Sequence, residues 1–276
     1  MILDKCKKEH FYEYVDICGK FVDIDKDNSY ELSEVMIKHC KNNKEQRCLD
    51  FIELENVWYE SFKTGNPDFS VYDNPLFVSD LWACWVMYSR DYLKRISSPK
   101  GILNSLEETI VSTRSIVEDM GEVNGVVDLG CGFGYTTAGL KEMFPNSDVY
   151  GTNIETSFQY KIATYFGKKY NFSIIPDCSH IGKKLDVVFA SEYFEHIEDP
   201  IKHLLGILDT LNPKFLIIAN AFNARALGHF DRYLFNGEYF DGKTISRMFN
   251  KTLRDKGYKK VQTNLWNDRP SYWKKV

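Results

Sequence analysis

The sequence predicts an α/β protein in which a mainly parallel sheet carries helices on both faces and is preceded by a smaller helical region. Up to about residue 100, apolar residues recur at helical spacing, whereas from about residue 122 short apolar runs alternate with helical stretches. Strands that alternate with helices indicate a parallel sheet whose two faces are both covered. We therefore expect a helical domain at residues 1–100 and a sheet domain at residues 101–276.

Size and composition limit the possible classes of protein. With 276 residues, of which 43% are hydrophobic, the chain can bury one large core and a smaller appended region. It has neither the ~18 uninterrupted apolar residues of a membrane helix nor an export signal at its start. The seven cysteines form no C-x-x-C pair, which indicates reduced thiols. We expect a cytoplasmic protein with no membrane partner.

The charge pattern indicates the kind of partner. The net charge is −4, and the lysines are scattered rather than gathered in a basic run. Because phosphate neutralisation is the usual source of nucleic-acid affinity, a polynucleotide partner is disfavoured. A small-molecule substrate is expected instead.

The expected elements follow from local patterns. In the N-terminal region, apolar and aromatic residues repeat at helical spacing behind Ser79, a suitable N-cap, and the pattern stops at Ser97. The candidates to line a substrate site in this helix are Trp82, Trp85, Tyr88 and Arg90, with an aromatic core as the alternative. The strands that we expect are residues 125–129, 148–152, 172–175, 185–190 and 214–219, followed by an antiparallel pair at 257–263 and 271–276.

A glycine-rich turn follows the first of these strands. Gly130, Gly132 and Gly134 have the spacing G-x-G-x-G after Asp128, with Cys131 between the first two glycines. Glycines let the backbone approach a ligand closely, and the next helix presents free N–H groups at its N-terminus. Dinucleotide-binding folds have G-x-G-x-x-G, so a nicotinamide-dependent oxidoreductase is disfavoured. A ligand site is therefore predicted here, with a purely structural turn as the alternative.

This turn resembles motif I of class I S-adenosylmethionine-dependent methyltransferases, which have a Rossmann-like sheet. In that family an acidic residue at the position of Asp128 interacts with the methionine part of the cofactor. The resemblance covers about residues 122–265. It implies S-adenosylmethionine as the cofactor, the glycine turn as part of its site, and methyl transfer as the activity. Helices that precede the sheet in this superfamily commonly cover the active site and select the substrate.

Two later strand ends extend the resemblance. Where the family usually has an acidic residue that holds both ribose hydroxyls, this sequence has Asn153, followed by Ile154 and Glu155. An amide can also make two hydrogen bonds to a diol, so the role is expected to persist, with Glu155 as a second candidate. Asp177 matches the position that contacts the adenine amino group in the family, and Cys178 follows it. A plain loop aspartate is the alternative for Asp177.

An acidic and histidine cluster follows the fourth expected strand. If this segment is helical, Glu192, Glu195 and His196 share one face at the carboxyl end of a central strand, where open sheets bind their substrates. The E-x-x-E-H pattern resembles ubiquinone-biosynthesis-type O-methyltransferases and small-RNA 2'-O-methyltransferases. Some members hold a divalent ion with these side chains, and the RNA enzymes add a histidine from a later loop. His229 is placed to be that histidine.

The cluster is compatible with two mechanisms. Two carboxylates and two imidazoles suit Mg²⁺ or Mn²⁺, which would make a bound hydroxyl easier to deprotonate. The predicted ligands are Glu192, Glu195, His196 and His229. In the metal-free alternative His196 is the general base, Glu192 touches the cofactor and Glu195 caps a helix. The candidate catalytic residues are His196, Glu192 and Glu195.

A separate acidic segment lies near the start of the chain. From Asp23 to Glu34, oxygen-bearing side chains occupy positions 1, 3, 5, 7, 9 and 12 of an EF-hand loop. Position 6, usually glycine, is Asn28, and no second loop of this type follows. An acidic, solvated turn between helices is the default interpretation, and Ca²⁺ binding is the alternative.

The leading hypothesis is O-methylation of a small polar molecule, such as a sugar or a biosynthetic intermediate. The E-x-x-E-H pattern with a later histidine also allows RNA 2'-O-methylation, which the acidic net charge opposes. A third possibility is a non-catalytic cofactor-binding interaction module, suggested by Asn153 and the acidic N-terminal segment.

Overall fold

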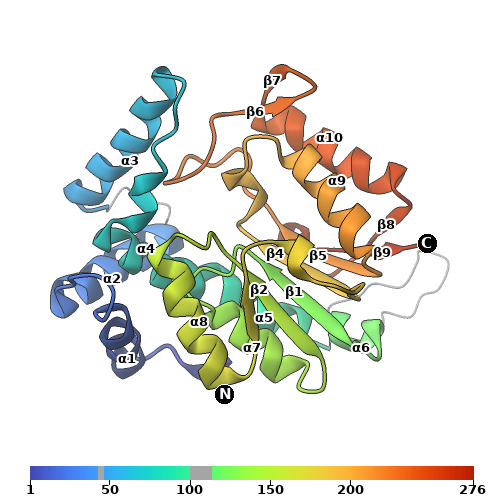
Figure 1. Cartoon of the computed structure of the whole chain (residues 1–276), viewed down its shortest axis with the longest axis horizontal. Helices are drawn as coiled ribbons and strands as arrows, with labels where there is room; N and C mark the ends of the chain where they lie inside the picture. The colour runs from blue at the N-terminus through green and yellow to red at the C-terminus, as the bar shows by residue number, and fades with distance from the viewer. Residues whose placement is uncertain (43–46, 100–113) are drawn as a thin grey trace.

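A seven-stranded sheet forms the centre of the computed structural model, which describes residues 1–42, 47–99 and 114–276 (Figure 1). The strand order is β3-β2-β1-β4-β5-β9-β8. Neighbouring strands from β3 to β5 are parallel, whereas β9 is antiparallel to both β5 and β8. The strands are β1 (Gly125–Leu129), β2 (Asp148–Thr152), β3 (Ser173–Ile175), β4 (Val187–Ser191), β5 (Phe215–Ala219), β8 (Tyr258–Val261) and β9 (Ser271–Lys275). This arrangement confirms the predicted Rossmann-like fold and its closing antiparallel pair.

Helices precede the sheet and connect its strands. The first group is α1 (Lys8–Cys18), α2 (Lys26–Asn42), α3 (Leu49–Lys63), α4 (Pro75–Cys84) and α5 (Arg90–Ile96), with a 3-10 turn, η2 (Phe69–Asp73), and a π-helical turn at Trp85–Ser89. The second group is α6 (Ile116–Met120), α7 (Tyr135–Met143), α8 (Phe158–Tyr170), α9 (Pro200–Leu211) and α10 (Gly242–Asp255). A small hairpin, β6 (Arg232–Phe235) and β7 (Glu238–Asp241), precedes α10.

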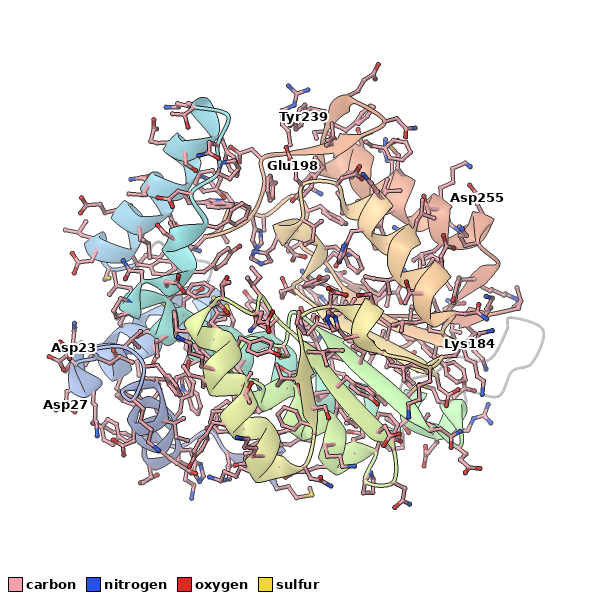
Figure 2. All side chains as sticks on the ribbon, viewed as in Figure 1. Asp23, Asp27, Lys184, Glu198, Tyr239 and Asp255 are labelled. Carbon is pink, nitrogen blue, oxygen red and sulfur yellow. The ribbon has the colours of Figure 1, made fainter. Side chains whose placement is uncertain are left out.

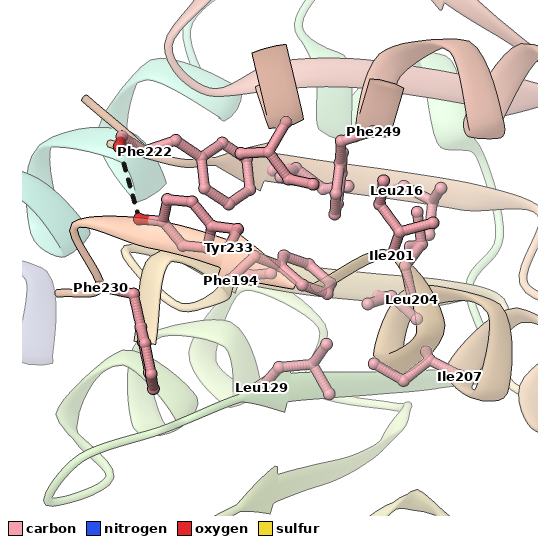
Figure 3. Packing of buried hydrophobic residues seen from close by; sticks show 14 of the residues in the cluster. Leu129, Phe194, Ile201, Leu204, Ile207, Leu216, Phe222, Phe230, Tyr233 and Phe249 are labelled. Atoms are coloured by element: carbon pink, nitrogen blue, oxygen red, sulfur yellow. Dashed lines mark hydrogen bonds between the residues drawn. The ribbon is translucent and has the colours of Figure 1, made fainter. Parts of the chain in front are cut away.

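Alternate strand residues build a core on each face of the sheet. Val127 and Leu129 pack with the side chains of α9 and α10, whereas Val126 packs with those of α7 and α8. Figure 3 shows the first of these cores, in which the rings of Phe194 and Phe249 lie 4.7 Å apart. All five residues of β1 are buried, so a ligand can reach this strand at its carboxyl end, where the sheet stops.

The N-terminal helices pack directly onto the second face. The ring of Tyr14 in α1 lies 5.0 Å from that of Phe133 in the glycine turn and 5.7 Å from that of Tyr135 in α7. Aromatic pairs at these distances add to the stability that burial provides. The N-terminal region therefore shares a core with the sheet, and the domain boundary at residue 100 stays a prediction.

Two local predictions were wrong. The aromatic helix begins at Pro75, capped by the side chain of Asn74, and Ser79 is buried inside it. In the acidic segment, α2 begins at Lys26, and the carboxylate of Asp25 accepts hydrogen bonds from the backbone N–H groups of residues 27 and 28. An aspartate that caps a helix explains the pattern. Most of the segment from Asp23 to Glu34 is thus helical rather than the loop that an EF-hand requires; Asp23 and Asp27 are labelled at the periphery in Figure 2.

Two further expectations concern the cysteines and the apolarity of the helices. All seven cysteines are free. Within the described ranges, the structure contains no helix that is long and apolar enough to cross a bilayer.

Candidate active site

The glycine turn lies where the strand order reverses. β1 and β4 are neighbours from which the chain continues in opposite directions along the sheet, and ligands bind at such points beyond the carboxyl ends of the strands. Gly130, Gly132 and Gly134 all have positive φ, between 54° and 90°, which glycine adopts without strain. Gly134 is the N-cap of α7. The three glycines that were predicted from spacing are therefore required by the backbone.

Asp128 lies directly beneath this turn and is almost fully buried. Its side chain accepts a hydrogen bond of 2.7 Å from the Thr137 hydroxyl of α7. Burial raises the pKa of Asp128 to about 7, although the Thr137 hydrogen bond opposes this change. Among the described residues no basic side chain pairs with this carboxylate, which is therefore suited to receive a cationic ligand group.

Two adjoining cavities open at the turn. The first, of about 110 Å³, extends towards the N-terminal helices and is lined by Asp128, Cys131, Trp82 and Trp85 among others. The second, of about 220 Å³, extends across β2 and is lined by Asn153, Ile154 and Pro176 among others. Six residues line both cavities: Phe77, Leu81, Gly130, Gly132, Glu192 and His196.

The predicted ribose and adenine contacts occupy different surroundings. The Asn153 side chain donates a 2.8 Å hydrogen bond to the Gly132 carbonyl and accepts one from the Ile154 N–H, so its amide is held against the glycine turn. Asp177 caps a short 3-10 turn and lines a neighbouring cavity together with Cys178. The roles of all four residues towards a cofactor stay predictions.

Glu192 has a strained backbone and a firmly held side chain. Its φ is 51°, a left-handed conformation that costs a residue with a Cβ roughly 1–2 kcal/mol. Its carboxylate oxygen Oε1 accepts hydrogen bonds from the Tyr92 hydroxyl at 2.9 Å and from the Arg269 guanidinium at 2.8 Å. Such outliers concentrate at functional sites, where surrounding contacts maintain them.

Glu195 is fully buried below the cavities. Its Oε1 accepts a 2.8 Å hydrogen bond from the Ala221 N–H, and its Oε2 has no hydrogen-bond partner within the described part of the chain. Burial, followed by the nearby carboxylate of Glu192, raises the pKa of Glu195 well above its ordinary value. The surroundings of this carboxyl therefore favour its neutral form.

Two imidazoles face one another beside the cavities. The rings of His196 and His229 lie 4.7 Å apart, nearly perpendicular. Burial lowers the pKa of both side chains, that of His229 to about 4, and the proximity of His229 further lowers that of His196. Both rings are neutral at pH 7.

The expected helical turn is not formed. Only Phe194–His196 makes a short 3-10 turn, and the left-handed backbone of Glu192 directs this residue away from it. Glu192 bonds to Arg269, Glu195 to the backbone of residue 221, and His196 to Tyr72. Over the described residues, no group of three or more His, Cys, Asp or Glu side chains is arranged to hold a metal ion. The predicted four-ligand site is therefore not assembled in this arrangement.

Sequence reasoning missed three side chains at the site. The hydroxyl of Tyr72 in η2 lies 3.0 Å from Nδ1 of His196. Arg269 reaches Glu192 from the connection between β8 and β9. Asp80 of α4 lines the first cavity, and burial raises its pKa to about 7. Of the N-terminal candidates, Trp82 and Trp85 line that cavity, whereas the Arg90 guanidinium contacts the Cys6 sulfur.

Part of the chain that holds this site is similar to known proteins. Residues 127–214 match a family model described as a methyltransferase domain. Malonyl-[acyl-carrier protein] O-methyltransferase 2 from Ilyobacter polytropus is 30% identical over 110 residues, which are 38% of this chain and 42% of that protein. The chain thus matches less than half the length of this curated relative.

Similarity to solved structures is also partial. An O-methyltransferase from a trans-AT PKS multienzyme of Brevibacillus brevis, in complex with S-adenosyl-L-homocysteine, is 23% identical, with a TM-score of 0.32 over 36% of this chain and 35% of that one. A sugar N-methyltransferase from Streptoalloteichus is 19% identical, with a TM-score of 0.33 over 39% of this chain and 45% of that one.

Proposed function

We propose, from the premise that this chain carries a class I S-adenosylmethionine-dependent methyltransferase domain, that the protein transfers a methyl group from S-adenosylmethionine to a hydroxyl of a small polar molecule. The observation that carries the proposal is the position of His196. This neutral imidazole lines both cavities beside Gly130 and Glu192, where a cofactor and an acceptor would meet.

The chemistry requires little besides alignment and removal of one proton. In the proposed reaction His196 accepts the proton of the acceptor hydroxyl while the oxygen attacks the sulfonium methyl group. The new C–O bond forms as the S–C bond breaks, and the electron pair of that bond remains on sulfur in S-adenosylhomocysteine. The imidazolium then releases its proton to water. Positioning supplies much of the rate because the sulfonium is already an activated donor.

Cofactor binding is the first test of this proposal. Calorimetric titration with S-adenosylmethionine is expected to give a dissociation constant on the order of micromolar to submillimolar, in the range usual for enzyme substrates. NADH is the control ligand and is expected not to bind. Absence of binding to the methyl donor would contradict the enzyme proposal and favour the interaction module.

Substitution of the base is the second test. His196→Gln is expected to lower methyl transfer by ~10²–10⁴-fold, the usual contribution of general base catalysis, while changing the affinity for S-adenosylmethionine only a few-fold. Formation of S-adenosylhomocysteine across a panel of sugars and phenols is the measurement. His203→Gln is the matched control, because His203 is also a partly buried histidine but bonds to the Tyr193 hydroxyl. Equal losses in both variants would argue against a base at position 196.

We propose a metal-independent reaction, because the Glu192 carboxylate is already paired with a guanidinium and burial raises the pKa of Glu195 well above its ordinary value. A divalent ion at this cluster would otherwise polarise the acceptor hydroxyl. Dialysis against EDTA is expected to leave turnover unchanged, and addition of Mg²⁺ or Mn²⁺ is expected not to raise it. Loss of turnover with EDTA that Mg²⁺ or Mn²⁺ restores in the wild type, but not in His229→Ala, would support the four-ligand prediction instead.

RNA 2'-O-methylation is the second candidate, and the proximity of the His196 and His229 rings favours it. Retention on immobilised RNA that falls steeply with salt, together with methylation of that RNA, would support this candidate over a small-molecule acceptor.

A further inference from the structure

Tyr72 connects three parts of the site. Its ring lies on η2, in the N-terminal region. Its hydroxyl lies 3.0 Å from Nδ1 of His196 and 3.4 Å from the carbonyl oxygen of Gly228. Its own carbonyl accepts a 3.2 Å hydrogen bond from the side chain of Gln159 in α8. The hydroxyl is thus held between a catalytic candidate and the loop that carries His229.

The loop that carries Gly228 and His229 is anchored by α3. The indole N–H of Trp58 in α3 donates to the His229 carbonyl at 2.8 Å. The Tyr59 hydroxyl donates to the Ala226 carbonyl at 2.8 Å and accepts from the Ala226 N–H at 2.9 Å. The Gly228 carbonyl is therefore a fixed acceptor rather than part of a freely moving segment.

The donors and acceptors around Tyr72 favour one position for the proton of the His196 ring. A backbone carbonyl can only accept, a phenol has one proton to donate, and a neutral imidazole carries its proton on one of two nitrogens. A phenol has an ordinary pKa of about 10 and keeps its proton at neutral pH. If that proton were donated to Nδ1 of His196, the phenol could not also donate to the Gly228 carbonyl, which lies 3.4 Å away. If Nδ1 carries the imidazole proton, it can donate to the phenol oxygen, and the phenol remains free to donate to the Gly228 carbonyl.

We infer that Tyr72 is a positioning residue that fixes His196 as its Nδ1–H tautomer and so leaves the Nε2 lone pair free to accept a proton. This inference deepens the proposed function and rests on it for its catalytic meaning. Nitrogen tautomers are set by the partner of the opposite ring nitrogen, and a hydroxyl that is itself held by a carbonyl defines that partner. A residue outside the matched family domain thereby determines which nitrogen of His196 can act.

Long-range ¹H–¹⁵N correlation NMR of the whole protein tests the tautomer without any acceptor. The chain has six histidines, and the signals of His196 are those that disappear in His196→Gln. In the wild type, Nδ1 of His196 is expected to resonate as a protonated nitrogen and Nε2 as an unprotonated one. Tyr72→Phe removes the acceptor for Nδ1–H, so loss of this pattern in favour of the other tautomer or a mixture is expected.

Tyr59→Phe is the matched control, because Tyr59 bonds to the same loop but not to His196. It is expected to leave the tautomer of His196 unchanged. An Nε2–H tautomer in the wild type, or the same tautomer in wild type and Tyr72→Phe, would overturn the inference. The tautomer is read in the free protein, so its failure is distinguishable from failure of the methyltransferase proposal, which calorimetry with S-adenosylmethionine tests.

Discussion

Replacing Asp128 with asparagine is expected to weaken S-adenosylmethionine binding by about 10–100-fold, since a hydrogen bond to a charged group contributes ~1.5–3 kcal/mol. The carboxylate lies beneath the glycine turn and lines the first cavity. Asparagine has nearly the same shape and can still accept the hydrogen bond from Thr137. The change therefore removes charge with little repacking, and calorimetry is the measurement.

The same substitution is expected to stabilise the ligand-free protein at pH 8. Burial raises the pKa of Asp128 from 3.8 to about 7, so between these values the folded protein keeps a proton that the unfolded chain has released. Stability then falls as pH rises through this window, and above pH 7 the ionised carboxylate lowers the free energy of unfolding by at most ~4 kcal/mol. Urea unfolding of Asp128→Asn at pH 5 and pH 8 is expected to show a smaller loss between the two pH values than the wild type.

Asp186→Asn provides a control of opposite sign. Asp186 lies just before β4, at the opposite edge of the sheet from the glycine turn. Burial alone would raise its pKa, but hydrogen bonds from Lys214 and from the Asn124 backbone N–H lower it. Its charge therefore stabilises the fold above its ordinary pKa, and its removal is expected to destabilise the protein at pH 8. The same direction of change in both variants would contradict the burial argument.

Gly228→Ala is expected to lower methyl transfer by about 100-fold, because misplacing a catalytic group by about 1 Å can cost that much. A Cβ at this position would lie 2.2 Å from the Tyr72 hydroxyl oxygen and 2.7 Å from Nδ1 of His196. The φ of Gly228 is 80°, so alanine also introduces backbone strain of roughly 1–2 kcal/mol. Tyr72 and His196 must both move to relieve the contact.

Gly237→Ala is the control that distinguishes the effect of backbone strain from the effect of contact with Tyr72 and His196. Gly237 has nearly the same φ, 85°, but a Cβ there would meet no atom within 4 Å. This variant is expected to lose ~1–2 kcal/mol of stability in urea unfolding, from backbone strain alone, and to keep its methyl transfer rate. If Gly237→Ala lost activity as Gly228→Ala does, strain rather than contact with His196 would explain the effect.

Local patterns in the sequence were sufficient to predict the sheet and the edge of the sheet at which the site lies. Asp128 lies near the carboxyl end of β1, and Asn153 and Glu192 directly follow β2 and β4; parallel strands bring these ends to one edge. The glycine spacing also predicted the turn, because each of its three glycines needs a backbone that other residues adopt only with strain.

The side-chain pairs within the site could not be predicted, because they join segments that are distant in the sequence. Tyr72 and His196 are 124 residues apart, and Arg269 and Glu192 are 77 apart. No periodicity relates such pairs. In the acidic N-terminal segment, where a solvated turn was the default interpretation and a calcium loop the alternative, Asp25 instead caps the start of α2. Aspartate is favoured both in turns and at helix N-caps, so the sequence alone did not distinguish these arrangements.

Because β9 lies between β5 and β8, local unfolding of β9 would also disturb the Arg269–Glu192 pair of the site. In the described sheet β8 pairs only with β9, so it is held to the sheet through β9, and opening of β9 would release both strands. Arg269 lies in the connection between them and would leave Glu192 in the same event. Backbone amides of β8 and β9 should therefore exchange with deuterium as one unit, and a ligand that needs the Arg269–Glu192 pair should slow that exchange although it touches neither strand.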